Sequence, residues 1–192
     1  DAKTTVPNNT VIGQEALNSN TTGSEKPGVG YNALYANTTG EYNAAVGNQA
    51  LDSNTTGDSN TGIGNRALQS NTTADNNTAV GSNALDTNTT GAQNTALGVS
   101  ALYANTTAAY NVAIGYRALT ANTTGAQNTA VGSFALEDIT TASYCTAIGY
   151  NGLRNNAAAN NTACGYAGLQ DNTTGEQNTA VGSYALVANT TG

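Results

Sequence analysis

The chain has 192 residues, a net charge of −7 and a charged fraction of only 9%. Its five Lys and Arg residues are spread singly and form no basic patch, which makes nucleic acid a poor partner. No basic amphipathic helix or long apolar run occurs, so the sequence does not predict insertion into a membrane. His is absent, which removes the commonest general base and the commonest metal ligand.

We expect residues 1–9 to be a lead-in segment and residues 10–192 to form one array of 17-residue repeats without a visible cap. The repeat reads Asn-Thr-Ala-Val-Gly-x-x-Ala-Leu-x-x-Asn-Thr-Thr-Gly-x-x. Its Leu residues are Leu17, Leu34, Leu51, Leu68, Leu85, Leu102, Leu119, Leu136, Leu153, Leu169 and Leu186. A period this short and regular predicts a solenoid in which each coil packs only on its neighbours. Open ends of such a rod suggest either a piece of a longer fibre or copies that join end to end.

Two segments of each repeat have the composition of β-strands. The first is Asn-Thr-Ala-Val, as in 77–80, and the second runs from Ala-Leu to Asn-Thr-Thr, as in 84–90. β-branched residues favour extended backbone, and the Gly residues supply turns. Helical solenoids need longer repeats, so we predict an all-β parallel β-solenoid (β-roll) of about eleven coils, roughly 50 Å long.

Stacking places equivalent residues in columns along the rod. We expect the Val/Ile column, represented by Val80 and Val131, to form the dry core together with the Leu column. Asn residues before the first strand are expected to bond amide to amide along the stack, and they are Asn43, Asn60, Asn77, Asn94, Asn111 and Asn128.

Two cysteines and one irregular coil interrupt this pattern. Cys145 replaces an Asn and Cys164 replaces a Val or Ile, so they lie in different columns about 10 Å apart, and we expect two free thiols, one of them in the core, rather than a disulfide. Ile139 replaces the Asn of Asn-Thr-Thr, and the following repeat is one residue shorter. A shortened turn explains this, and a kink or a partner contact is the alternative.

The phrase NTAVGSNALDTNTTGAQNTALG at 77–98 resembles the head repeats of YadA-like trimeric autotransporter adhesins. It is also similar to the Asn-Thr-Ala-Val-Gly repeats of phage tail-fibre-like proteins and related bacterial surface proteins, and the resemblance covers nearly the whole chain. The resemblance implies a parallel β-roll, three chains wound side by side, and a role in attachment at a surface.

Each Asn-Thr-Thr is formally an acceptor for N-glycosylation. The alternative is that Asn and Thr cap a turn through hydrogen bonds from side chain to backbone. Because the acceptors share one column that we expect to be exposed, a glycan-coated fibril is a second interpretation. The candidate acceptors are Asn20, Asn37, Asn54, Asn71, Asn88, Asn105, Asn122, Asn172 and Asn189.

Repeated Thr and Tyr residues suggest a binding surface. Columns of Thr resemble the regular hydroxyl and methyl arrays of ice-binding β-solenoids, and exposed Tyr can bind glycans or partner proteins. Packing between chains explains the Tyr residues equally well. The candidate surface consists of Thr22, Thr39, Thr56, Thr90, Tyr35 and Tyr103.

The sequence offers no catalytic, cofactor-binding or metal-binding motif. Carboxylates such as Asp58 and Asp75 are scattered singly, which suits solubility better than acid–base chemistry. We therefore expect a non-enzymatic structural segment of an extracellular, cell-surface or virion-surface fibre, with an adhesive role in which the fibre presents a repeated surface. The expected partners are further copies of the chain, as a homotrimer or an end-to-end polymer, and a glycan or protein of a host surface.

Overall fold

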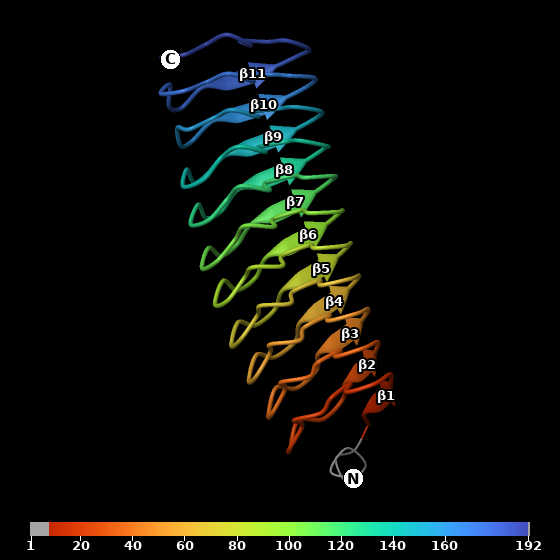
Figure 1. The fold of residues 1–192 in the computed structure, drawn as a ribbon. Helices are drawn as coiled ribbons and strands as arrows, with labels where there is room; N and C mark the ends of the chain where they lie inside the picture. The colour runs from red at the N-terminus through yellow and green to blue at the C-terminus, as the bar shows by residue number, and fades with distance from the viewer. Residues whose placement is uncertain (1–7, 192) are drawn as a thin grey trace.

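The computed structural model describes residues 8–191. Within this range eleven three-residue strands pair in parallel and in chain order to form one sheet, which confirms the predicted β-solenoid. The coils stack into a rod, and the sheet runs along it from β1 to β11 (Figure 1). The strands are β1 (Thr10–Ile12), β2 (Pro27–Val29), β3 (Ala44–Val46), β4 (Thr61–Ile63), β5 (Thr78–Val80), β6 (Thr95–Leu97), β7 (Val112–Ile114), β8 (Thr129–Val131), β9 (Thr146–Ile148), β10 (Thr162–Cys164) and β11 (Thr179–Val181).

The register of the sheet follows the sequence repeat. Ala79 in β5 pairs with Ala96 in β6, one repeat later. The short repeat changes only the connection, because Thr146 in β9 pairs with Thr162 in β10 and the ladder continues without a slip. The missing residue is therefore absorbed by a shortened turn, as one of the two interpretations predicted.

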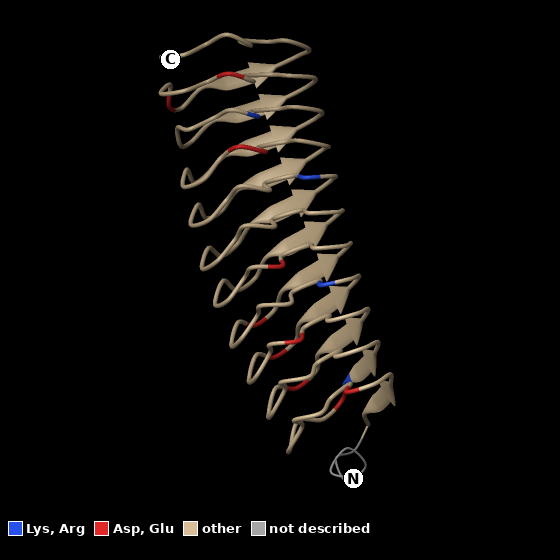
Figure 2. Ribbon diagram, viewed as in Figure 1, with Lys and Arg blue, Asp and Glu red and all other residues tan. Residues whose placement is uncertain are grey.

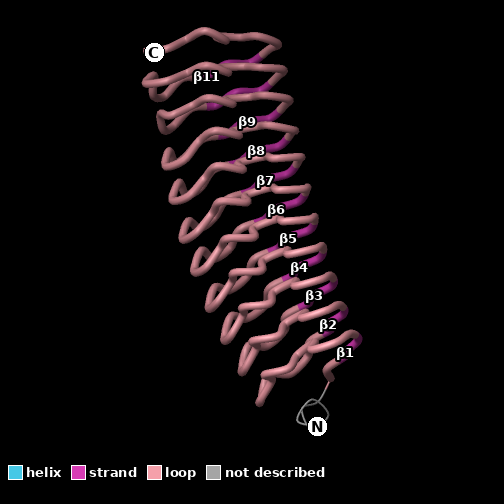
Figure 3. Tube along the Cα trace, viewed as in Figure 1, coloured by secondary structure: helices cyan, strands magenta, loops and turns pink. Residues whose placement is uncertain are grey.

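Each coil contains one strand, so the prediction of a second strand over 84–90 is wrong (Figure 3). The backbone there turns instead, and the Asn88 N–H donates to the Leu85 carbonyl at 3.3 Å. The Leu of every described coil has φ between 48° and 54°, a left-handed conformation that costs an L-residue roughly 1–2 kcal/mol. Burial of the Leu side chain in a coil too narrow for a second strand offsets this cost.

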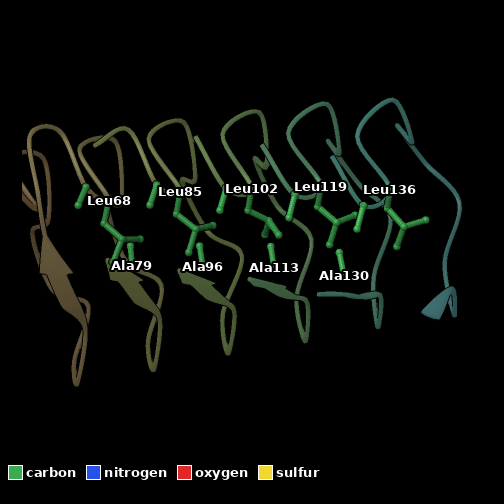
Figure 4. Packing of buried hydrophobic residues seen from close by; sticks show 14 of the residues in the cluster. Leu68, Ala79, Leu85, Ala96, Leu102, Ala113, Leu119, Ala130 and Leu136 are labelled. Carbon is green, nitrogen blue, oxygen red and sulfur yellow. The ribbon is translucent and has the colours of Figure 1, made fainter. Parts of the chain in front are cut away.

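The core is a single file of Leu side chains facing two columns of Ala. Leu102 and Ala113 are fully buried, and Figure 4 shows the Leu side chains directed toward the Ala residues of the strands. The predicted Val/Ile core column is wrong, because Val46 and Ile63 are 40% and 41% exposed. Successive residues of a strand point to opposite faces, so the inward Ala forces its neighbours outward.

The regular spacing of the Gly after each strand reflects the stacking of the coils. Gly81 has φ of +137°, and a Cβ atom built on it would lie 2.5 Å from the carbonyl oxygen of Gly98 in the next coil. Both the backbone conformation and the close approach require glycine at this corner.

Candidate functional site

The Asn residues of Asn-Thr-Thr form a buried amide ladder, which we call the ladder asparagines. Asn54 Nδ2 donates to Asn37 Oδ1 in the preceding coil at 2.9 Å and to the Gly57 carbonyl of its own turn at 3.0 Å. Its Oδ1 accepts from Asn71 Nδ2 at 2.9 Å. An amide with an asparagine on both sides in the ladder therefore closes its own turn and joins two neighbouring coils.

The expectation that these Asn residues are exposed is wrong. Eight of the nine candidate acceptors, Asn20, Asn37, Asn54, Asn71, Asn88, Asn105, Asn122 and Asn172, are at most 2% exposed, and Asn189 in the last described coil is half-buried. A sugar would have to be attached to a buried Nδ2 whose hydrogens are already donated. The turn-capping interpretation therefore fits the folded coil, whereas glycosylation of a buried position would require the coil to open.

The six Asn residues that were expected to bond amide to amide before the strands are also buried, but they do not bond to one another in this way. These pre-strand asparagines are Asn43, Asn60, Asn77, Asn94, Asn111 and Asn128. Asn43 Oδ1 accepts from the backbone N–H of Asn60 at 2.9 Å, and Asn43 Nδ2 donates to the Gly57 carbonyl at 2.7 Å. Of the predicted lead-in segment, residues 1–7 lie outside the described part. Asn9 already occupies the pre-strand position, since its Oδ1 accepts from the Lys26 N–H at 3.0 Å.

Ile139 and Cys145 interrupt both Asn columns in adjacent coils. Both side chains are buried in the hydrophobic core, and Asn122 Oδ1, which faces the Ile139 coil, has no hydrogen-bond partner. Cys145 and Cys164 are both free, as expected, but Cys145 is the buried thiol and Cys164 lies exposed on the sheet. Burial raises the pKa of the Cys145 thiol.

The structure leaves the predicted binding residues exposed but does not bring them into one cluster. Thr22, Thr39, Thr56 and Thr90 follow the turn, and Tyr35 and Tyr103 lie in a different column of the coil. Within residues 8–191 no hydrogen bond or ring contact joins these tyrosines to that Thr column. The preceding Thr hydroxyls are used internally, as in the bond from Thr55 Oγ1 to the Thr72 carbonyl at 3.0 Å.

A continuous line of exposed apolar side chains lies on the outward side of the strands, which we call the outer sheet face. The third residue of each strand forms an apolar ladder, represented by Leu97 and Ile148 at 46% and 45% exposure, and the first residue is most often Thr. The described strands contain no charged residue, and Figure 2 shows acidic and basic residues only outside them. The members of the apolar ladder are Ile12, Val29, Val46, Ile63, Val80, Leu97, Ile114, Val131, Ile148, Cys164 and Val181.

An aromatic ladder accompanies the sheet in its second half only. Consecutive ring centroids are 5.3, 5.6, 5.3 and 5.1 Å apart. Tyr150 and Tyr166 stack nearly parallel, with planes 12° apart, so their ring faces are turned toward each other. The ladder consists of Tyr116, Phe134, Tyr150, Tyr166 and Tyr184.

Buried carboxylates are paired with half-exposed arginines. Glu137 Oε1 lies 3.1 Å from Arg117 Nε, and Glu137 Oε2 lies 2.6 Å from Arg154 Nε. Asp86 Oδ2 lies 3.2 Å from a guanidinium nitrogen of Arg66. Burial raises the pKa of Asp86, and the charge of Arg66 opposes that shift. Because each pair joins neighbouring coils, these groups read as structural links rather than as an acid–base site.

The outer sheet face was missed because the Val/Ile residues were assigned to the core. Alternation within Thr78-Ala79-Val80 was the available signal, because Thr78 and Val80 must share a face. An inward Val would have required an inward Thr in most coils, with an unpaired hydroxyl. The small and nearly uniform Ala between them identifies the inward side.

Comparison with protein-family models, with curated proteins and with solved structures gave no match to this chain. The part of the chain that the structure describes contains no helix with the length and hydropathy of a membrane span. Nor do residues 8–191 bring together three or more His, Cys, Asp or Glu side chains in a possible metal-binding group.

Proposed function

We propose that the chain is a non-enzymatic structural segment of an extracellular, cell-surface or virion-surface fibre. In this fibre three copies lie side by side, parallel and in register, through their outer sheet faces. The observation that carries the proposal is the apolar ladder, which follows the described rod from β1 to β11 and which one chain leaves uncovered. The adhesive role is the part of the proposal that the sequence resemblance supports.

The size of the outer sheet face suits a partner that is equally long. Eleven coils at about 4.8 Å and strands about 10 Å wide give roughly 500 Å² per copy. Stable interfaces bury roughly 800 Å² per partner. The exposed rings of the aromatic ladder, which follow the Gly corner of their coils, are further apolar surface. The apolar ladder occupies part of this area as one continuous strip, and an exposed apolar patch of this size is often functional.

A second copy is the partner whose chemistry and spacing match best. Its ladder has the same spacing between coils, and it is likewise free of charge in the strands. Packing two such ladders in register removes Val and Ile side chains from water and leaves no ionised group unpaired at the contact.

Measuring the mass of the native particle tests the proposal. Light scattering on the purified protein should give three chains per particle, and a single-chain rod would overturn the proposed assembly. A variant with Val80→Lys and Ile114→Lys should remain folded by circular dichroism but fall apart into single chains, because each Lys places a charge in the apolar contact. The matched control, with Thr90→Lys and Thr124→Lys on the exposed turn, should keep the mass of the wild type.

Cys164 provides an independent test of which face is used. In a parallel, in-register assembly its exposed thiol lies beside the same thiol of a neighbour, whereas Cys145 is buried. Mild oxidation should therefore join two chains, and Cys164→Ala should prevent the link. A trimer that is never crosslinked under these conditions would place the interface on another face.

Ice binding is a second candidate, and the Thr column of the strands favours it. Thr61, Thr78 and Thr95 stand in register on adjacent strands beside the apolar ladder, giving a regular array of hydroxyl and methyl groups. This array lies on the outer sheet face instead of the turn where the sequence placed it. A single-chain particle with thermal hysteresis that is lost in Thr78→Lys would favour this candidate over the fibre.

A further inference from the structure

Lys26 occupies the position that a pre-strand asparagine holds in most other coils, and its side chain is fully buried. Its Nζ donates to the Gly40 carbonyl at 2.8 Å, the same kind of acceptor that Asn43 Nδ2 uses in the next coil. The longer Lys side chain makes one additional contact. Nζ also donates to Asn20 Oδ1 at 2.5 Å, and Asn20 is itself buried.

The buried amine has no carboxylate in direct contact. Its two hydrogen-bond acceptors are neutral, and the ion pairs within residues 8–191 involve only arginines. Burial lowers the pKa of Lys26 to about 8, and the negative charges of Glu41 and Asp58 oppose the shift without cancelling it. A buried ammonium without a paired carboxylate is costly, so any reaction that removes the charge is favoured by the surroundings.

We propose that Lys26 and Asn20 form an intramolecular isopeptide bond. The neutral Nζ attacks Cγ of the Asn20 amide and forms a new C–N bond. A proton passes from Nζ to Nδ2, the Cγ–Nδ2 bond breaks, and ammonia leaves. The reaction exchanges one amide for another and consumes no oxidant, reductant or other reactant.

The contacts around the pair hold it in a reactive arrangement. With Nζ 2.5 Å from Oδ1 and a carbonyl bond of about 1.23 Å, Nζ lies roughly 3–3.7 Å from Cγ. Attack requires the Asn20 amide to rotate so that Nζ lies above the amide plane, and the distance to be covered is short. The Gly40 carbonyl fixes Nζ from its other side. A desolvated lysine is an activated nucleophile, because a larger share of it is neutral than in water.

Asn37 supplies the polarisation that the amide carbonyl needs. Its Nδ2 donates to Asn20 Oδ1 at 3.3 Å, so negative charge that develops on this oxygen during attack meets a fixed donor. The ladder asparagines thus contribute both the electrophile, Asn20, and the group that stabilises its oxyanion. Lys26 is the one lysine among the described residues, so this chemistry is confined to the first two coils.

The product would join the first coil covalently to the second. Asn20 lies in the turn of the first coil, and Lys26 immediately precedes strand β2 of the second. The bond would therefore hold these two coils together even when the hydrogen bonds between them open.

Intact-mass spectrometry of the purified chain, incubated at about pH 9 to favour the neutral amine, tests the proposal. The expected result is a mass lower than that of the sequence by one ammonia. When the tryptic peptide is fragmented, a single backbone break between residues 20 and 26 should not split it into two fragments, because the Asn20–Lys26 bond still connects both sides of the break. After unfolding, Lys26 should no longer react with an amine-specific label.

Lys26→Asn is the matched control, because it restores the residue of the repeat and is expected to fold. Lys26→Arg keeps a buried positive charge but removes the nucleophilic amine. Both variants should retain the full mass. A wild-type mass equal to that of the unmodified sequence, with no loss of ammonia, overturns the proposal. So does an ammonia loss that persists in both variants or is reversed by hydroxylamine, since either result would indicate a succinimide at an asparagine.

Discussion

The two sides of the coil invert the usual distribution of polar and apolar residues. The ladder asparagines on the turn side are buried, whereas the Val and Ile residues of the outer sheet face are exposed. Asn54 satisfies both its amide hydrogens and its oxygen inside the coil, while the narrow interior has room for little beyond one Leu and two Ala per coil. The difference shows that hydrogen-bond satisfaction and available volume, more than residue polarity, decide which side chains this fold buries.

The largest effect is expected from breaking the ladder in the middle of the rod. Asn88 donates to Asn71 Oδ1 at 3.0 Å and to the Gly91 carbonyl at 2.9 Å, and it accepts from Asn105 Nδ2 at 2.8 Å. Asn88→Ala removes three bonds and leaves Asn71 Oδ1 buried without a donor. We expect a loss of about 2–4 kcal/mol in the free energy of unfolding, measured by urea denaturation.

The control for this variant is Thr90→Ala, two residues further along the same turn. Thr90 is exposed, and its replacement should change the free energy of unfolding by less than about 0.5 kcal/mol. Equal losses for the two variants would contradict the claim that the buried amides, and not the turn as a whole, stabilise this side of the coil.

A smaller effect is expected from the buried carboxylate of Asp86. Burial raises its pKa in the folded chain above that of the unfolded chain, so the folded state binds the proton more tightly. Stability from this group therefore increases as the pH falls through the folded pKa and is lost as the pH rises. The free energy of unfolding of wild type minus that of Asp86→Asn should increase on mild acidification. The change should be about 1 kcal/mol or less, because the half-exposed Arg66 compensates in part.

Thermal unfolding in a pH series measures this difference, and the subtraction removes contributions from the other carboxylates. Asp52, whose pKa burial also raises, serves as the parallel case through Asp52→Asn. A difference that falls on acidification would mean that the ion pair with Arg66 outweighs the burial of Asp86.

Restoring the interrupted ladder should have a small net effect. Ile139→Asn removes a buried apolar side chain, worth about 1.5–3 kcal/mol, and gives the unpaired Asn122 Oδ1 a donor, worth about 1–3 kcal/mol. We expect a net change within about 1 kcal/mol. In an Asn122→Ala background the same change should be destabilising by a further 1–3 kcal/mol or so, and a double-mutant cycle by urea denaturation measures this coupling. Additive effects would show that the new amide does not join the ladder.

The period of the sequence was enough to predict the parallel solenoid, its register and its Leu column. The fixed spacing of Leu85 and Leu102 requires stacking, and Gly81 marks the corner that follows each strand. The absence of a second strand could not be predicted, because Thr89 and Thr90 have high strand propensity in isolation. Their backbone is bent by the turn bonds that Asn88 organises, and such tertiary bonds override propensity.

The candidate site was predicted less well, for a related reason. Asn-Thr-Thr reads as an exposed polar turn when each residue is judged alone, and only the stacked neighbours reveal that Asn71 and Asn88 satisfy each other. The buried Lys26 was also invisible in the sequence, since a lysine is almost never fully buried in proteins. Its Asn-like position in the repeat was the one available signal.

The smallest effect, and the sharpest test of the contrast between the two faces, concerns the apolar ladder. Val80 is half-buried on the outer sheet face, and Val80→Thr keeps its shape while adding a hydroxyl that water can reach. In dilute solution the free energy of unfolding of the variant should lie within about 0.5 kcal/mol of that of the wild type, because an isolated chain already leaves this position in contact with water. The wild type should gain thermal stability as the protein concentration increases, since association stabilises only the folded chain, and Val80→Thr should gain less.

If both proteins behave identically at every concentration, the ladder is not an interface and its apolar character serves the single chain. If the variant is already destabilised in dilute solution, Val80 belongs to the core after all, and the inversion of the two faces would be incomplete.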